Sequence, residues 1–199
     1  MNRTIFLIHL LLICTANING QHQEFSGSGD DVIIIEKPQE NVPALLYVEG
    51  NKSQRHFSIT AYDSDRNLVG LLVNTLKTYS GIVGLDLPSQ TETRMLEISA
   101  VGPWLIHLYP IEKATVIEIG ETLTAKGDNV LRISGDAITA TIIGNASQSH
   151  FSVTAYDESG SLKGLMVNTI NEYSGKVLVP DNAAILEIRA VGNWEVTLE

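Results

Sequence analysis

One stretch of this chain is present twice. Residues 56–81 read HFSITAYDSDRNLVGLLVNTLKTYSG, and residues 150–175, 94 positions later, read HFSVTAYDESGSLKGLMVNTINEYSG. About 19 of the 31 positions that start at Ser53 and Ser147 are identical, and the similarity continues into SGSGDDVIII with TAKGDNVLRI and MLEISAVGPWLI with ILEIRAVGNWEV. Each copy has about 85–90 residues, which suits a small domain and is too long for a propeller blade. The duplication predicts two copies of one folded unit, divided near residues 112–118.

Apolar residues recur at every second position within each copy. Phe57, Ile59 and Ala61 share one side of an extended chain. This alternation is typical of half-buried strands, and the Gly-, Asp- and Asn-rich segments between them are typical of turns. Seven or eight short strands per copy predict an all-β protein with two tandem antiparallel β-sandwich, jelly-roll-like domains, at residues 21–115 and 116–199. A helical turn fits only residues 68–81, and the boundary lacks a flexible spacer, so we expect the domains to lie close together.

The N-terminus has the pattern of a secretory signal peptide. Arg3 precedes an apolar run from Ile5 to Cys14, and small and polar residues follow. We place the cleavage near Gly20, which makes residues 1–20 the signal peptide. A lipoprotein would need a small residue before Cys14, where Ile13 stands. The apolar run is shorter than the roughly 20 residues that span a bilayer, so we predict a secreted, extracellular protein with no transmembrane span.

Charge and cysteine content exclude several classes of protein. The net charge of the chain is −10, and loss of the signal peptide with its single Arg leaves 12 basic and 23 acidic residues, a net charge of −11. This balance argues against nucleic acid as a partner. Once Cys14 has left with the signal peptide, no cysteine is left for a disulfide or a Cys-based zinc site.

Two histidines and two tyrosines are candidate ligand-binding residues. His56 and Ser58 lie two positions apart, about 7 Å along one strand face, and His150 is the copy of His56. A nucleophile and its base need direct contact and a third group that orients the base. No such group occurs at a recognisable spacing, so we predict that the protein is not an enzyme. Tyr79 and Tyr173 stand in YSG segments, where a turn can expose their rings.

Calcium is the only cofactor that the residues suggest. Asp30, Asp31, Asp128 and Asn129 carry side-chain oxygens at equivalent positions of the two copies, although Gly-Asp before a strand is also ordinary turn chemistry. Asp63 opens a second acidic segment, DSDRN, which lacks the central Gly and the terminal acidic ligand of an EF-hand loop. We interpret that segment as a hairpin turn.

Two further pairs are duplicated. Asn51 and Asn145 each begin an N-glycosylation sequon, between predicted strands where a glycan could be accommodated. Trp104 and Trp194 follow Gly in the AVGPW and AVGNW segments, in step with the apolar residues that come after them. We interpret both indoles as core anchors rather than as platforms for sugar stacking.

The motifs GxGDxV, HFxVxAYD, LVNT, YSG and LEIxAxGxW, taken together, resemble an uncharacterised β-sandwich repeat of secreted and cell-surface proteins, many of them bacterial. The resemblance covers essentially the whole chain after residue 20, one copy at a time. It implies an extracellular accessory or interaction module and identifies no catalytic residue. The first copy departs from the pattern by two insertions, at Lys37–Glu40 and near residues 88–93.

These observations predict a secreted noncatalytic binding or adhesion module whose partner is a glycan or a protein at an extracellular surface. Two weak sites on one chain gain avidity through effective concentration, which is a physical reason for the duplication. The alternative is a structural surface or matrix component in which the domains act as spacers. A hydrolase is the least favoured class, because no nucleophile and base come together.

Overall fold

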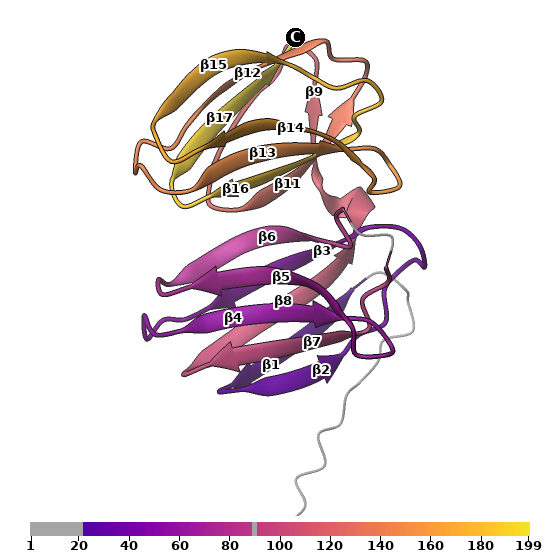
Figure 1. Ribbon diagram of the computed structural model, residues 1–199, viewed down its shortest axis with the longest axis vertical. Helices are drawn as coiled ribbons and strands as arrows, with labels where there is room; N and C mark the ends of the chain where they lie inside the picture. Colours follow the sequence, from indigo (N-terminus) through magenta and orange to yellow (C-terminus); the bar gives the residue numbers. More distant parts are fainter. Residues whose placement is uncertain (1–21, 89–90) are drawn as a thin grey trace, which may run out of the picture.

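A computed structural model describes residues 22–88 and 91–199 (Figure 1). The predicted all-β class is confirmed, since the described residues form strands β1–β17 and one helical turn, η1 (Ile111–Lys113). The strands form four open sheets, antiparallel except for one parallel pair. No helix in these two ranges is long and apolar enough to cross a membrane. The predicted signal peptide, residues 1–20, lies outside the described residues.

The first half of the chain, β1–β8, forms two four-stranded sheets. The order in one sheet is β1-β8-β3-β6, and in the other it is β2-β7-β4-β5. The strands are β1 (Gln23–Ser28), β2 (Asp31–Ile34), β3 (Ala44–Gly50), β4 (Phe57–Tyr62), β5 (Leu68–Thr75), β6 (Tyr79–Leu85), β7 (Met95–Ala100) and β8 (Pro103–Pro110).

The second half, β9–β17, has the same two sheet orders. They are β10-β17-β12-β15 and β14-β13-β16-β11, and β9 adds to the second sheet as a parallel neighbour of β11. The strands are β9 (Thr115–Glu118), β10 (Thr122–Lys126), β11 (Asn129–Ser134), β12 (Thr139–Gly144), β13 (Phe151–Tyr156), β14 (Leu162–Thr169), β15 (Tyr173–Leu178), β16 (Ile185–Ala190) and β17 (Asn193–Leu198).

Residues 68–81, where the sequence allows a helical turn, form β5 and the start of β6, joined by a bend at Leu76 and Lys77. Residues 68–75 form β5, which pairs with β4 through two register shifts. Each shift leaves an extra residue in β5, Leu72 at one and Val69 at the other, because Thr60 pairs with Leu71 while Ile59 pairs with Val73. Extra residues reverse the alternation of a strand, which is why this stretch does not show a clean two-residue period.

Each half has its own apolar core between its two sheets. The alternating residues Phe57, Ile59 and Ala61 are fully buried in the first core, and their counterparts are buried in the second. Gly50 lies under the ring of Phe57, where an added Cβ would come within 2.7 Å of the ring. Trp104 is buried as predicted, and its indole N–H donates to the carbonyl of Gly29 at 3.0 Å.

The two halves are in direct contact. Figure 1 shows β11 and β16 of the second half lying over the β5 and β6 side of the first half. A third apolar cluster fills this junction. Its buried members are Leu45, Ile111, Ala114, Val130, Tyr156 and Ile185. The outer face of one sheet in the second half therefore packs against the edge of the first.

Candidate functional site

A polar cluster lies beside the apolar junction. Asp128, at the start of β11, accepts hydrogen bonds from the hydroxyl of Tyr79 at 2.6 Å and from the backbone N–H of Ala190 at 2.8 Å. The backbone carbonyl of Asp128 also accepts the N–H of Ile82 at 2.9 Å. Because Tyr79 and Ile82 belong to the first half, Asp128 binds the edge strand β6 through both its side chain and its main chain.

Arg189 and Glu187 on β16 extend this cluster. One guanidinium nitrogen of Arg189 lies 2.8 Å from Glu187, and the other donates to the carbonyl of Leu72 at 2.8 Å. Glu187 also accepts the hydroxyl of Tyr156 at 3.2 Å and the backbone N–H of Gly84 at 3.4 Å. One cation and two carboxylates are thus satisfied by groups from both halves.

The electrostatics of this cluster favour a structural role. Burial raises the pKa of Tyr79, and the nearby Asp128 carboxylate raises it further. Burial and Glu187 raise the pKa of Tyr156 in the same way. Burial opposes the charge of Arg189, but Glu187 and Asp128 outweigh that effect and its pKa is raised. The tyrosines therefore remain neutral and the arginine charged at neutral pH, which suits a permanent contact and not proton transfer.

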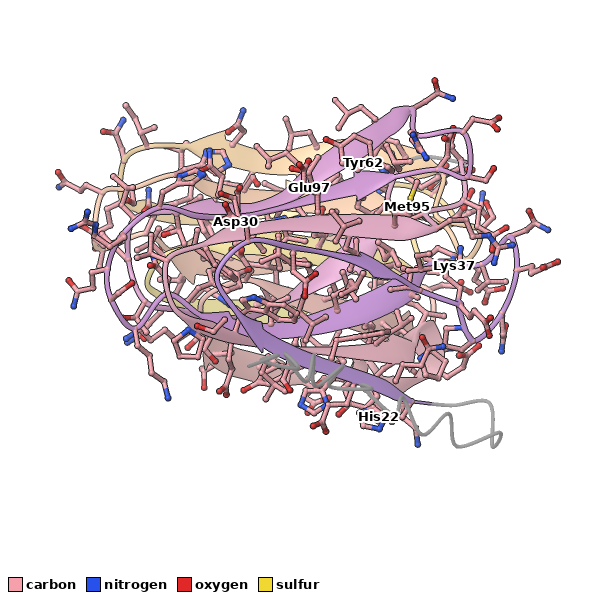
Figure 2. All side chains as sticks on the ribbon, turned by 90° about the horizontal axis from the view of Figure 1, so that it is seen from below. His22, Asp30, Lys37, Tyr62, Met95 and Glu97 are labelled. Carbon is pink, nitrogen blue, oxygen red and sulfur yellow. The ribbon has the colours of Figure 1, made fainter. Side chains whose placement is uncertain are left out.

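The first half carries the counterparts of these residues on an exposed surface. We define the β2–β7–β4 face as Asp30, Val32, Ile34, Tyr62, Met95 and Glu97, most of which are labelled in Figure 2. On this face Tyr62 donates to Glu97 at 2.7 Å, just as Tyr156 donates to Glu187. Strand pairing is also the same, since Val32 lies opposite Glu97 and Val130 opposite Glu187.

Exposure separates the two faces. Val130 is fully buried by the first half, whereas Val32 is 59 % exposed. Ser99 on β7 stands where β16 has Arg189, and its hydroxyl donates to Asp30 at 3.2 Å. The β2–β7–β4 face is thus an uncovered copy of an interface with two cations fewer, since Ile34 also stands where β11 has Arg132.

The predicted ligand-binding residues do not come together. Tyr79 lies in the junction between the halves, and Tyr173 begins β15 and packs partly on the second core. His56 and His150 are exposed. The hydroxyl of Ser58 lies 3.3 Å from Nε2 of His56, and no third group is found orienting that imidazole among the described residues. This geometry lacks what nucleophilic catalysis needs.

The predicted calcium ligands accept hydrogen bonds, locally at Asp31 and Asn129 and from distant strands at Asp30 and Asp128. Asp30 accepts the N–H of Ala100 at 2.9 Å, Asp31 accepts that of Val32 at 2.8 Å, and Asn129 accepts that of Val130 at 2.8 Å. Asp128 is bound by Tyr79 and Ala190 as described above. The local contacts of Asp31 and Asn129 are of the kind that turn chemistry gives, and calcium at these residues stays a prediction.

A different group has the ligand types of a metal site. The ligand atoms of His22, Glu24 and His107 all lie within 4.8 Å of one another, on β8 and at the start of β1. The rings of His22 and His107 share a 2.8 Å contact between Nε2 and Nδ1. Imidazole and carboxylate suit zinc and similar ions. Sequence reasoning missed this group because only the β1–β8 pairing brings together residues that lie 85 positions apart.

The two sequons are not in accessible positions. Asn51 and Asn145 are each only 3 % exposed. The amide nitrogen of Asn145 donates to the carbonyls of Ser149 at 2.6 Å and Asn171 at 2.9 Å, and Asn51 makes the equivalent bonds. A glycan on this nitrogen would break these bonds, and glycosylation at Asn51 and Asn145 stays a prediction.

The insertions of the first copy meet each other in the fold. Lys37 comes from the first insertion, and its Nζ lies 2.5 Å from Asp86, which precedes the second insertion. Asp86 also accepts the hydroxyl of Thr93 at 2.6 Å. Both charged side chains are buried, at 2 % and 6 % exposure. The first insertion and the strand end that leads into the second are therefore joined by one buried ion pair.

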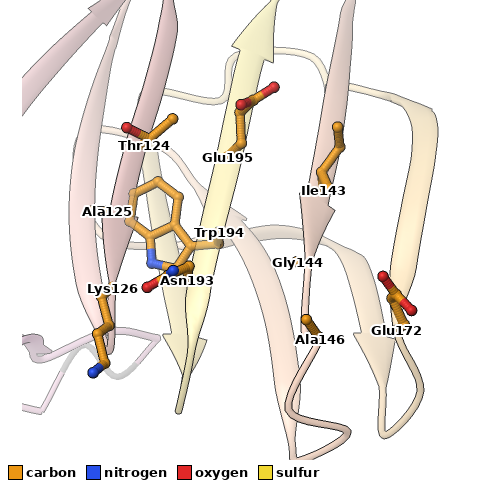
Figure 3. A pocket seen from close by; sticks show the side chains of 10 residues that line it. All are labelled: Thr124, Ala125, Lys126, Ile143, Gly144, Ala146, Glu172, Asn193, Trp194 and Glu195. Atoms are coloured by element: carbon orange, nitrogen blue, oxygen red, sulfur yellow. The ribbon is translucent and has the colours of Figure 1, made fainter.

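An open hollow of about 590 Å³ lies on the β10-β17-β12-β15 sheet (Figure 3). Polar and charged side chains surround an apolar floor formed by Ala125, Ile143 and the edge of Trp194. The polar residues are Thr124, Lys126, Glu172, Asn193 and Glu195. Its breadth and openness differ from an enclosed catalytic pocket.

No family model matches the chain, and neither does any curated protein. Among solved structures, the chain is similar to the PBSX exported protein XepA, with 11 % identity, coverage of 90 % of this chain and 87 % of that chain, and a TM-score of 0.33. It is also similar to YhaK from Escherichia coli (12 % identity, 89 % and 83 % coverage, TM-score 0.28). A third is the guanosine-bound regulatory subunit of a cAMP-independent protein kinase A from Trypanosoma cruzi (12 %, 89 % and 72 %, 0.27). Likeness at this level carries no argument about function.

Proposed function

We propose that this protein is a secreted, noncatalytic binding or adhesion module made of two tandem β-sandwich domains, residues 21–115 and 116–199. We propose further that it binds a protein at an extracellular surface through its β2–β7–β4 face. One observation carries this proposal: the equivalent face of the second half binds a protein surface, the first half of the same chain, while this face is uncovered.

The chemistry of the face supports a protein partner. Val32 and Ile34 are large apolar side chains that are 59 % and 74 % exposed. Tyr62 and Glu97 form a polar pair beside them, and Asp30 lies at the end of the row. An exposed apolar patch with a polar border is the usual form of a protein interaction site.

A glycan is the second candidate partner, because of the hollow in Figure 3. Lys126, Asn193 and Glu195 offer hydrogen-bond donors and acceptors around an apolar floor. A sugar ring presents hydroxyls at its rim and C–H groups on its faces, so such a surface suits it. The glycan would then occupy the second half and leave the β2–β7–β4 face free.

Adhesion of the purified protein to the cells that secrete it tests the proposal. We expect protease treatment of the cells and the Val32→Asp substitution each to abolish binding, while Leu76→Asp, at a similarly exposed turn outside the face, leaves it intact. A glycan partner would be favoured by binding that resists protease treatment and that Val32→Asp leaves unchanged. In that case Asn193→Ala and added sugar should each abolish binding. Absence of adhesion would overturn the proposed function.

A further inference from the structure

We infer that the partner of the β2–β7–β4 face is a second copy of this chain, which presents the exposed end of its second half. This inference rests on the proposed function and names the partner of the same site. The contact between the two halves of one chain is its template.

The template joins two unlike surfaces. One is the outer face around β11 and β16, and the other is the side of the first half formed by β5 and β6. Outward N–H groups of the edge strand β6 reach the face, since Ile82 donates to Asp128 and Gly84 to Glu187. Tyr79 adds its hydroxyl bond to Asp128. Face and edge are thus complementary through both main chain and side chains.

The second half presents the corresponding edge without a cover. We define the β14–β15 end as Leu165, Tyr173, Lys176 and Leu178. Pairing to the neighbouring strand has the same register, since Thr139 lies opposite Leu178 as Leu45 lies opposite Gly84. The main-chain N–H groups of β15 that point away from the sheet are therefore those of Lys176 and Leu178, the counterparts of Ile82 and Gly84. An unpaired strand edge of this kind favours association with another chain.

Charge differences between the two copies compensate each other. The β2–β7–β4 face lacks both arginines of the covered face, because Ser99 stands in place of Arg189 and Ile34 in place of Arg132. Within residues 22–88 and 91–199, no ion pair joins Glu97 to a cation. The β14–β15 end gains a cation, because Lys176 stands where the first half has Ile82. Lys176 is paired with the exposed Glu199 and lies on the surface. In a contact with the geometry of the template, Lys176 would face the acidic residues Asp30 and Glu97.

Apolar groups are complementary as well. Gly84 has no side chain, and Leu87 fills the space beside it: an added Cβ would lie 2.3 Å from Cδ1 of Leu87. Leu87 also packs into the junction between the halves. The second copy has no such loop, but it has Leu178 at the position of Gly84, and this side chain is 73 % exposed. Leu178 can therefore supply to a second chain the apolar contact that Leu87 supplies within this one.

Such a contact is heterologous, since a face on one copy meets an end on the next. In a pair, one copy keeps a free face and the other keeps a free end. Further copies can therefore add in succession, to form an open chain or a closed ring. Variants that block only one of the two surfaces make this geometry testable, because a face-blocked copy and an end-blocked copy can still bind each other once.

The test is sedimentation of the purified chain without its signal peptide, over a range of concentrations in about 150 mM salt, where long-range interactions between exposed charges are screened. We expect species that grow with concentration, and we expect Val32→Asp and Leu178→Asp each to weaken association about tenfold or more. A mixture of these two variants should stop at dimers, while the control Leu76→Asp should associate as the unchanged protein does. Circular dichroism checks that each variant is folded.

Two results would overturn the inference. One is a monomer at every concentration, and the other is association that neither variant weakens. The proposed function is judged separately, by adhesion to cells. If copies stay monomeric while Val32→Asp still abolishes protease-sensitive adhesion, the face binds a different protein and only the inference is wrong.

Discussion

Breaking the ion pair between Lys37 and Asp86 gives the sharpest test of the fold. Lys37→Met leaves the Asp86 carboxylate buried without its cation, and among the described residues its remaining hydrogen bonds come from Thr93. Removal of one partner from a buried ion pair costs about 3–5 kcal/mol. For a protein of this size, 1 kcal/mol shifts the midpoint of thermal unfolding by roughly 2–4 °C, so we expect a loss of roughly 6–20 °C in Tm, measured by circular dichroism.

Two further variants show whether burial of charge is the cause. Lys37→Met combined with Asp86→Asn removes both charges and keeps an acceptor for Thr93, so it should recover most of the lost stability. Glu40→Gln breaks the exposed pair with Arg94 in the same region, which should cost about 0–1 kcal/mol. A Tm change below about 2 °C for Lys37→Met would refute the reasoning, as would a double variant no more stable than the single one.

Three other substitutions test the junction and the turns. Gly160→Ala should lower the free energy of unfolding in urea by about 2 kcal/mol, since φ is +84° and the added Cβ would lie 2.6 Å from Pro43. The control is Arg66→Ala, at the equivalent, exposed position of the first copy, where φ is 66°. It should change that free energy by less than about 0.5 kcal/mol. Above pH 10.0, the usual pKa of tyrosine, Tyr79 loses its proton in the unfolded state and keeps it in the folded state. The free energy of unfolding should therefore fall with pH by about 1.4 kcal/mol per unit more than it does in Tyr79→Phe. Equal pH slopes of the two proteins would exclude a raised pKa. Protein folded before exposure to oligosaccharyltransferase should carry no glycan at Asn145 by mass spectrometry, whereas a denatured sample should accept one.

Local pattern was sufficient to predict the strands and the core. Phe57 and Trp104 lie in the core because strand periodicity and burial of apolar area act within a few residues. Prediction was weaker at β5, where register shifts hide the alternation. For Asn51 the sequon was visible in the sequence, but its burial depends on carbonyls at Arg55 and Lys77, which only the folded turn brings near.

The candidate site was much less predictable. Arg189 and Ser99 differ at one position of otherwise similar LEIRA and LEISA segments, and this difference is one sequence signal that one face is covered and the other is not. A second signal is Arg132, which stands where the first half has Ile34. Neither signal identifies the contacting surface, because the groups that bond Arg189 and Glu187 come from β5 and β6 of the other half.

The sequence by itself determined the all-β class, the positions of most turns and the identity of the core residues, since each depends on local periodicity and side-chain chemistry. Only the tertiary structure decided how the two halves meet. Two equivalent segments end in different environments, with Val130 buried and Val32 exposed, because a junction between unlike surfaces must cover one copy of the face and leave the other free. That asymmetry comes from packing over long sequence distances, and the uncovered face is what the proposed association would bury.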